Sequence, residues 1–383
     1  MKTIVFTAQA FGFGPVSKML AISESLSDVH KIFFGSGVAF DLASLHSFDE
    51  IHNFEHSDKE KILSLLKRSD LFINVMDFPL GGLAKLAGCT YYLIDTLLWF
   101  WPKCPESVEH ATLYFCQEFF GRVEPKIHEY GLKNAQLVGP IRSDTFSRLP
   151  KRDQVIVNFG GMECPFIQVG SNSQYPFVIL KALLPILQSR FANVLVTGRE
   201  RVIQMCRKKF GEDDRLQFRM LDRKSMLEEL YRSPALLTTP GIEIFYDAFD
   251  KLPIFCLPPQ SDSNWKDLEI FVDHNAIKHS FQWKELYELD FKKNLDEEEM
   301  IKIVLAMIKI SEYSQKDQNL LREKVERFLA VSDTWPELVL SQKKIVEKFG
   351  DNGTKVIVEE IQKLLLPPDF HDAKSCHLQT IRV

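Results

Sequence analysis

The sequence predicts an α/β protein made of two tandem halves. Three observations support this fold class: the chain has 383 residues, strand and helix patterns alternate along most of it, and each half begins with an apolar strand that runs into a glycine loop. A chain of this length exceeds one compact core and fits two domains of roughly 150–200 residues each. Strands that alternate with helices are typical of βαβ units on a parallel sheet.

The first half, which we predict as a domain over residues 1–145, contains short apolar runs of strand type separated by helical patterns. Its runs are rich in β-branched and aromatic residues, whereas its helical segments place apolar residues three and four apart. The expected strands are 3–8, 30–36, 71–77, 90–95, 111–117 and 135–139, and the expected helices are 17–26, 59–68 and 81–88.

The second half repeats this pattern, and we predict a domain over residues 153–350. Beyond residue 290 the sequence is helical and charged, which indicates amphipathic helices whose charges face solvent. Residues 351–383 are predicted to form a C-terminal helix that packs back on the first domain, followed by a surface tail. The expected strands are 154–161, 192–198, 216–221, 235–239 and 253–259, and the expected helices are 176–190, 224–233, 241–249, 296–310, 320–331 and 353–366.

Composition narrows the class of protein. A net charge of −5 gives no support to nucleic acid as the main partner. The seven cysteines form no CxxC pair and the ten histidines no HxH or HExxH spacing, so we expect no metal site, no disulfide framework and a cytoplasmic location. The apolar run at the N-terminus is too short for a signal peptide or a membrane span, and no other run suits a span.

The two glycine loops are the first candidate binding elements. Gly12 and Gly14 follow the strand at 3–8, and Gly160 and Gly161 follow residues 154–159 of the first strand of the second half. Ligands of open α/β sheets bind outside the carboxyl ends of the strands, where glycine lets the backbone approach them. The first loop lacks the third glycine of the pattern GxGxxG, because Pro15 follows Gly14, and this argues against a nicotinamide cofactor.

Residues 238–264 contain the most informative segment of the chain. A helix that begins at Gly241 presents free backbone N–H groups around Gly241 and Ile242 to a diphosphate. Glu243 and Asp247 lie four residues apart on one face of that helix, where a carboxylate would accept both hydroxyls of a ribose. The alternative is an amphipathic helix with two solvated acids.

The spacing of this segment resembles that of GT-B glycosyltransferases. The likeness is greatest to the UDP-sugar-dependent branch that includes the lipid II-forming N-acetylglucosaminyltransferase and the antibiotic and plant UDP-glycosyltransferases. In that branch a carboxylate follows a glycine by six residues, and a pair of prolines five apart precedes a polar Asp-Gln loop. Asp247 follows Gly241 by six, Pro258 follows Pro253 by five and Asp262 follows Pro258 by four, although Pro253 comes one residue early.

The resemblance implies a fold of two Rossmann-like domains facing across a cleft, and assigns roles to residues of the second domain. Asp247 would hold the ribose, with Glu243 as the competitor, and the backbone near Leu221 would lie beside the base. Ser263 stands where the family has glutamine, which leaves the donor sugar open. Arg199 follows a strand end, where it would pair with a phosphate or be a solvated surface residue. The residues expected at the donor sugar are Gln260, Asp262 and Asn264.

The catalytic base is the main departure from the family. Many inverting members carry a histidine in the first glycine loop, whereas Pro15 occupies about that position here. Asp95 and Asp77, each at a strand end, and Glu118, just after one, are the candidate bases. Asp95 is preferred, and the alternative for each is a structural hydrogen-bonding acid.

The resemblance implies an inverting transfer of a sugar from a nucleoside diphosphate, with UDP expected, to a small acceptor. The aromatic cluster at residues 97–105 would stack on an aromatic or apolar acceptor, or else pack beneath the cleft. No cofactor and no metal ion are expected. The competing functions are a nucleotide-sugar hydrolase or epimerase of the same fold, and a catalytically inactive binding protein.

Overall fold

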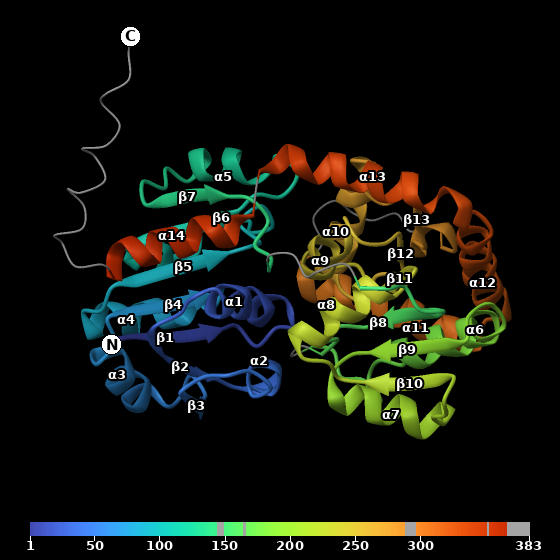
Figure 1. Ribbon diagram of the computed structural model, residues 1–383, viewed down its shortest axis with the longest axis horizontal. Helices are drawn as coiled ribbons and strands as arrows, with labels where there is room; N and C mark the ends of the chain where they lie inside the picture. Colours follow the sequence, from blue (N-terminus) through green and yellow to red (C-terminus); the bar gives the residue numbers. More distant parts are fainter. Residues whose placement is uncertain (144–148, 164–165, 288–295, 351, 366–383) are drawn as a thin grey trace, which may run out of the picture.

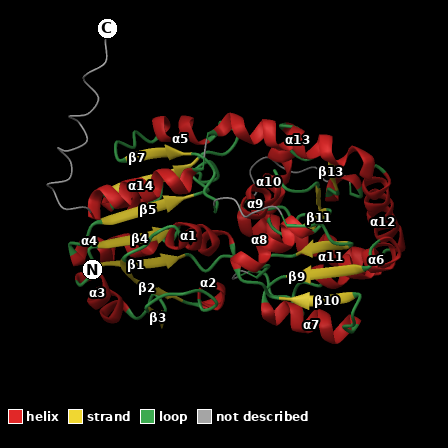
Figure 2. Cartoon of the chain, viewed as in Figure 1, coloured by secondary structure: helices red, strands yellow, loops and turns green. Residues whose placement is uncertain are grey.

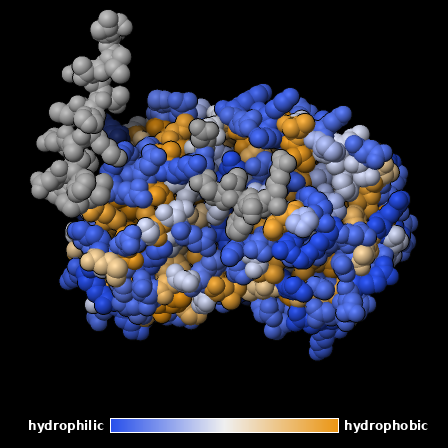
Figure 3. Space-filling model, viewed as in Figure 1, coloured by the Kyte–Doolittle hydropathy of each residue, from blue (hydrophilic) through white to orange (hydrophobic). Residues whose placement is uncertain are grey.

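The computed structural model describes residues 1–143, 149–163, 166–287, 296–350 and 352–365. Two α/β halves lie side by side, the first coloured blue to teal and the second green to orange in Figure 1. In each half, helices lie along the strands of a parallel sheet (Figure 2). The predicted α/β fold class is confirmed. On the face shown in Figure 3, hydrophilic side chains predominate and apolar ones are scattered among them.

The first sheet has seven parallel strands in the order β3-β2-β1-β4-β5-β6-β7. Its central strands are buried along most of their length because helices cover both faces, which explains their continuous apolar sequences. The strands are β1 (Lys2–Ala8), β2 (Val29–Gly35), β3 (Glu50–Asn53), β4 (Leu71–Val75), β5 (Tyr91–Asp95), β6 (Leu113–Gln117) and β7 (Ala135–Val138).

The helices of this half follow the strands in alternation. The longest begins in the first glycine loop, where Pro15 in its first turn suits the fixed φ of proline. The helices are α1 (Gly14–Glu24), α2 (Gly37–Ala43), α3 (Lys59–Lys67), α4 (Gly81–Ala87) and α5 (Val123–Glu129), with short 3₁₀ turns η1 (Phe78–Leu80) and η2 (Glu106–His110).

The second sheet has six parallel strands in the order β10-β9-β8-β11-β12-β13. Its strands are β8 (Gln154–Asn158), β9 (Asn193–Thr197), β10 (Leu216–Arg219), β11 (Ala235–Thr238), β12 (Ile254–Cys256) and β13 (His279–Ser280). Its helices are α6 (Tyr175–Arg190), α7 (Glu200–Phe210), α8 (Arg223–Arg232), α9 (Ile242–Ala248), α10 (Asp262–Asp273), α11 (Glu297–Tyr313), α12 (Gln315–Ala330) and α13 (Trp335–Val346), with η3 (Trp283–Glu285), η4 (Ser332–Thr334) and η5 (Glu347–Phe349).

The last helix, α14 (Gly353–Leu365), returns to the first half and lies along its sheet (Figure 1). The Gly353 amide donates to the carbonyl of Pro140, and the Thr354 hydroxyl donates to the carbonyl of Arg142 at 2.8 Å. Ile357 is fully buried in the apolar core of that half. The predicted tail, residues 367–383, lies outside the described residues.

Each sheet reverses its strand order at the strand that precedes a glycine loop. β1 pairs with β2 on one side and β4 on the other, and β8 pairs with β9 and β11. Such a switch point opens a crevice at the carboxyl end of the sheet. The two glycine loops therefore lie at the crevices of their own sheets.

Sequence patterns located the principal strands but missed two strands at the sheet edges and several helices. β3, β13, α2, α5, α7 and α13 were not predicted. Residues 260–264 follow the proline pair, where the resemblance implies a polar loop, and this expectation is wrong for most of them. Helix α10 begins at Asp262, and Ser261 caps it by accepting from the Asn264 amide.

Candidate functional site

The two glycine loops touch each other across the domain boundary. A Cβ added to Gly161 would lie 2.6 Å from the Cα of Gly12 and 2.7 Å from the amide nitrogen of Phe13. Gly12 and Gly160 adopt φ of +61° and +62°, a left-handed conformation that favours glycine. The close approach therefore explains Gly161, and backbone geometry explains Gly12 and Gly160.

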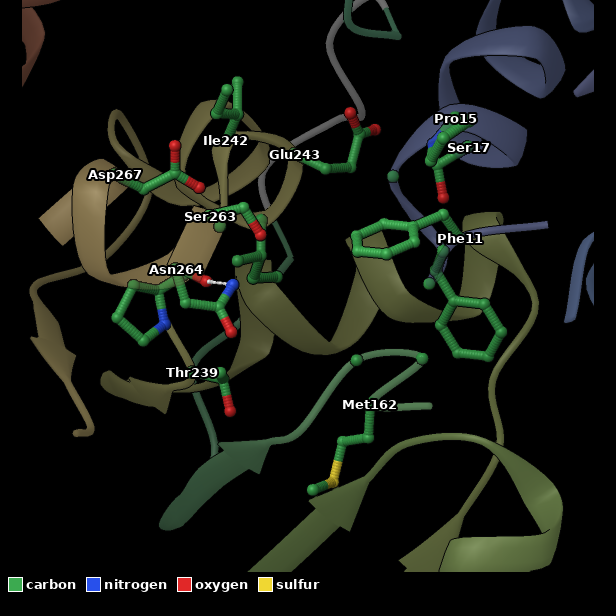
Figure 4. A pocket seen from close by; sticks show the side chains of 18 of the residues that line it. Phe11, Pro15, Ser17, Met162, Thr239, Ile242, Glu243, Ser263, Asn264 and Asp267 are labelled. Atoms are coloured by element: carbon green, nitrogen blue, oxygen red, sulfur yellow. Dashed lines mark hydrogen bonds between the residues drawn. The ribbon is translucent and has the colours of Figure 1, made fainter. Parts of the chain in front are cut away.

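Beside this contact lies a cavity of about 240 Å³ between the two halves. Phe11 and Pro15 of the first half face Asp267, Ser263 and Asn264 of the second across it (Figure 4). Most of the predicted binding residues line this cavity, namely Gly12, Gly14, Gly160, Gly161, Gly241, Ile242, Glu243, Asp247, Gln260 and Asn264.

A smaller cavity of about 60 Å³ adjoins the first one. Leu221, predicted beside a nucleotide base, lines this smaller cavity together with Leu42 of the first half. Asp247 and Phe13 line both cavities. The two cavities are therefore neighbours, and a path from Leu221, past Asp247, to the residues of α10 would cross both of them.

A buried ionic cluster joins the two cavities. Arg223 donates to Glu243 at 2.8 Å and, through both terminal nitrogens, to Asp247 at 3.2 and 3.3 Å. Lys18, on α1 of the other half, forms an ion pair with Glu243 and donates to the carbonyl of Ile141 at 2.7 Å. Glu243 and Asp247 are thus not the solvated acids of the alternative interpretation, because both face buried cations.

Burial and charge act against each other in this cluster. Burial by itself would lower the pKa of Arg223, but Asp247 and Glu243 outweigh it and hold that pKa above its ordinary value. Burial raises the pKa of Glu243, and Lys18 opposes this rise. The cluster contains two acids and two bases, so each buried charge has an opposite partner.

Arg199 is not part of the lining of either cavity. Its guanidinium donates to Asp41 of the first half at 2.7 and 3.0 Å and to Glu163 at 3.0 Å. A second arginine, Arg201, also pairs with Glu163. The structure therefore places Arg199 in an ionic contact between the halves and not at the position predicted for a phosphate ligand.

Asp95, the preferred catalytic base, is fully buried beneath the cavity and does not line it. Its Oδ1 accepts from the Leu97 amide at 2.6 Å, and its Oδ2 accepts from Tyr114 at 2.6 Å and Trp101 at 3.0 Å. These donors occupy the oxygens that a base would need, so the geometry is that of a structural acid. The aromatic cluster packs here, with Trp99 stacked on Phe119 at 4.7 Å.

Asp95 is expected to make stability depend on pH. Burial raises its pKa to about 6 in the folded protein, against about 3.9 in an unfolded chain. The folded state therefore holds this proton more tightly, and its contribution to stability is lost as pH rises through 6. Asp95→Asn should remove about 2–3 kcal/mol of this dependence between about pH 4 and pH 7, as measured by urea unfolding.

Asp70→Asn is the control for this effect. A hydrogen bond from Lys2 lowers the pKa of Asp70, so its contribution is present at neutral pH and is lost as pH falls. The two variants should shift the pH profile in opposite directions. An Asp95→Asn profile parallel to that of the wild type would contradict the assignment.

The other two candidate bases are also held by internal contacts. Asp77 is buried and accepts from His56 at 2.8 and 3.0 Å, and this hydrogen bond raises the pKa of His56. Glu118 accepts from the amides of Phe119 and Gly121, both at 2.7 Å, in the turn after β6. Neither acid lines the cavity.

The polar end of the cavity is formed by the start of α10 and the residues before it. Asn264 donates to the carbonyl of Pro240 at 2.5 Å, while its Oδ1 and the Oε1 of Gln260 have no hydrogen-bond partner among the described residues. Asp262 is buried, pairs with Lys266 at 2.8 Å and does not line the cavity. The structure thus brings Gln260 and Asn264 to the cavity but not Asp262.

Sequence reasoning missed four charged residues at these cavities: Lys18, Glu163, Arg223 and Asp267. Lys18, Arg223 and Asp267 lie inside helices, where a charged residue is expected to face solvent. Only Lys18 carried a signal in the sequence, because it is the single charged residue of an otherwise uncharged stretch, residues 14–23, next to the first glycine loop.

Two further findings concern the described ranges as a whole. Within them, no group of three or more His, Cys, Asp or Glu side chains is arranged to hold a metal ion. None of the helices in those ranges combines the length and apolar character that a membrane span requires.

Solved structures share this two-domain architecture. The chain matches Arabidopsis thaliana UGT89C1 complexed with UDP at a TM-score of 0.59 and 11% identity, over 96% of this chain and 100% of that one. It matches a ugt transferase from Siraitia grosvenorii in complex with UDP at a TM-score of 0.56 and 9% identity, over 96% of this chain and 100% of that one. It matches the S. aureus MnaA–UDP structure at a TM-score of 0.51 and 13% identity, over 95% of this chain and 97% of that one.

The similarity to these solved structures agrees with the arrangement of the two sheets in this chain. Two parallel sheets that face each other across a cavity at their switch points define the GT-B fold, and this chain has that fold. No protein-family model and no curated protein sequence matches the chain.

Proposed function

We propose that the protein transfers a sugar from a UDP-sugar donor to a small acceptor, with inversion at the transferred carbon. The observation that carries this proposal is the pair of neighbouring cavities, which share the buried carboxylate of Asp247 in their linings, with unpaired side-chain oxygens at one end of the larger cavity. Proteins of the same fold are solved in complex with UDP. A further structure of Arabidopsis thaliana UGT89C1 is complexed with UDP-L-rhamnose.

In this proposal the donor lies in both cavities. The base lies beside Leu221 in the smaller cavity, and the ribose hydroxyls donate to Asp247, whose orientation Arg223 holds. The diphosphate lies between the contact of the glycine loops and Gly241, near the ammonium group of Lys18. The sugar lies against Gln260 and Asn264.

The remaining lining supports an aromatic or apolar acceptor. Phe11, Met76, Leu97 and Ile244 present apolar side chains to the cavity. An apolar molecule gains free energy when it leaves water for such a surface. We propose that no metal ion or other cofactor is needed, because positioning and fixed positive groups can stabilise a departing diphosphate; EDTA should then leave turnover unchanged.

A second candidate function is hydrolysis or epimerisation of a nucleotide sugar. What favours it is the lining itself, in which no histidine occurs among the described residues and from which Asp95, Asp77 and Glu118 are absent. A transfer to an alcohol needs a base that accepts the hydroxyl proton. Hydrolysis or epimerisation does not transfer the sugar to an alcohol, and this would explain why the three acids predicted as the base do not line the cavity.

The direct test is incubation with UDP-, GDP-, TDP- and CMP-sugars, with and without aromatic alcohols, while nucleotide release and sugar products are followed. Release only with an acceptor supports the transferase. Release without an acceptor indicates a hydrolase, and a new sugar isomer on UDP indicates an epimerase. Binding without turnover would identify an inactive binding protein.

Asp247→Ala should weaken UDP binding at least tenfold, because it removes the acceptor of the ribose hydroxyls. Isothermal titration with UDP measures this, and circular dichroism checks the fold. Asp250→Ala is the matched control, since Asp250 follows shortly after in the chain but pairs with Arg142 outside both cavities. Equal losses in both variants, or none in Asp247→Ala, would contradict the assignment.

A further inference from the structure

The carboxyl group of Asp267 faces the interdomain cavity without a hydrogen-bond partner for one of its oxygens. Asp267 lies in the second turn of α10, is 4% exposed and lines the cavity. Its Oδ1 has no partner among the described residues. Native proteins pair nearly all buried polar atoms with protein or ordered water, so an unpaired one that borders a cavity is free to bond to a ligand that enters it.

Two neighbours of Asp267 share this property. The Oε1 of Gln260 and the Oδ1 of Asn264 are buried, have no partner in the described ranges and border the same cavity. Asn264 and Asp267 are three residues apart, so they lie on one face of α10. Figure 4 shows this face opposite Phe11 and Pro15. Three unpaired oxygens therefore gather at one end of the cavity.

The charge state of Asp267 adds a second property. Burial, and then the nearby Asp262, raise the pKa of Asp267 well above its usual range, which favours the neutral carboxyl. A neutral carboxyl both donates and accepts a hydrogen bond, and the amide oxygens beside it accept. An apolar ligand would leave these atoms unpaired, whereas a ring with several adjacent hydroxyl groups would satisfy them.

We propose that Asp267 is a specificity-determining residue that hydrogen-bonds a hydroxyl group of the donor sugar, beside Gln260 and Asn264. This inference rests on the proposed binding of a UDP-sugar and extends it to a residue buried in the middle of α10. In the free protein the unpaired carboxyl lowers stability, and the bound sugar removes that penalty.

The test compares UDP with UDP-sugars in the full chain. Titrations with UDP, UDP-glucose, UDP-galactose and UDP-N-acetylglucosamine give a sugar increment, the ratio of the Kd of UDP to that of the tightest UDP-sugar. Asp267→Leu should leave the Kd of UDP unchanged and lower this increment about tenfold. Asp267→Asn, which keeps a polar group of the same shape, should retain most of it.

Thermal unfolding separates this role from a structural one. Leucine replaces an unpaired polar group by an apolar one, so Asp267→Leu should raise Tm by about 2–4 °C while it weakens sugar binding. If that variant does not fold, Asp267→Ala takes its place in the titrations. An unchanged sugar increment, or equal losses for UDP and UDP-sugar, would overturn the proposal for Asp267, whereas a wild-type protein that does not bind UDP would refute the proposed function itself.

Discussion

Replacing Arg223 by methionine is expected to destabilise the protein by about 3–5 kcal/mol. Arg223 is buried and donates to both Glu243 and Asp247. Without its guanidinium, two carboxylates one helical turn apart would share a buried site in which Lys18 is the remaining cation of the cluster. Methionine matches much of the volume of the side chain, so lost charge and not lost packing would dominate. Urea unfolding at neutral pH measures the effect.

The same variant should recover part of its stability in acid. Protonation removes the repulsion between the two acids, and the already raised pKa of Glu243 brings that protonation closer to neutral pH. The control is Arg152→Met, because Arg152 is half exposed and pairs with Glu229 at 3.5 Å; its cost should stay below about 1 kcal/mol. Equal costs for the two variants would show that the buried cluster is not a major source of stability.

Replacing Gly161 by alanine is expected to disrupt ligand binding more than folding. The added Cβ would meet backbone atoms of Gly12 and Phe13 at 2.6–2.7 Å, and backbone cannot rotate away as a side chain can. Carbon atoms pack at about 3.5–4.0 Å, so the two loops must separate by about 1 Å. A displacement of that size at the cavity is expected to reduce UDP affinity and turnover by about 10- to 100-fold.

Gly82→Ala is the matched control for that variant. Gly82 lies in α4, and a Cβ added there would meet no atom within 4 Å. Alanine should therefore leave UDP binding unchanged and stabilise the helix slightly. Titration with UDP and small-angle X-ray scattering compare the two variants, the latter to detect domain opening. Wild-type UDP affinity in Gly161→Ala would show that the loop contact does not control the cavity.

Local pattern was sufficient for the central strands of both sheets and for the glycine positions whose backbone borders the cavity. Gly12, Gly161 and Gly241 were located because a glycine after a buried strand, or before a helix, has few interpretations, and all three line the cavity. Asp247 was located by its spacing from Gly241, and it lies at the junction of the two cavities. Each of these inferences depends only on residues that lie within a few positions of each other in the sequence.

The acids at strand ends show where local pattern failed. Topology correctly placed Asp95 at the end of a strand, but whether its carboxylate faces the cavity depends on Trp101 and Tyr114, which turn it inward. Arg199 likewise follows a strand end, yet Asp41, 158 residues away in the sequence, holds it. The spacing of residues along the chain does not predict contacts between side chains that are this far apart in the sequence.

Local patterns in the chain were enough to predict two α/β halves with parallel sheets, a glycine loop after the first strand of each half, and the helix that carries Glu243 and Asp247. Periodicity and glycine placement involve residues that are close in the sequence, so they can be recognised in the sequence alone. Only the tertiary structure decided that Lys18 and Arg223 pair with those acids, that Asp95 is internal and that Asp267 faces the cavity. Burial and charge pairing arise when distant segments meet, so they belong to the folded chain.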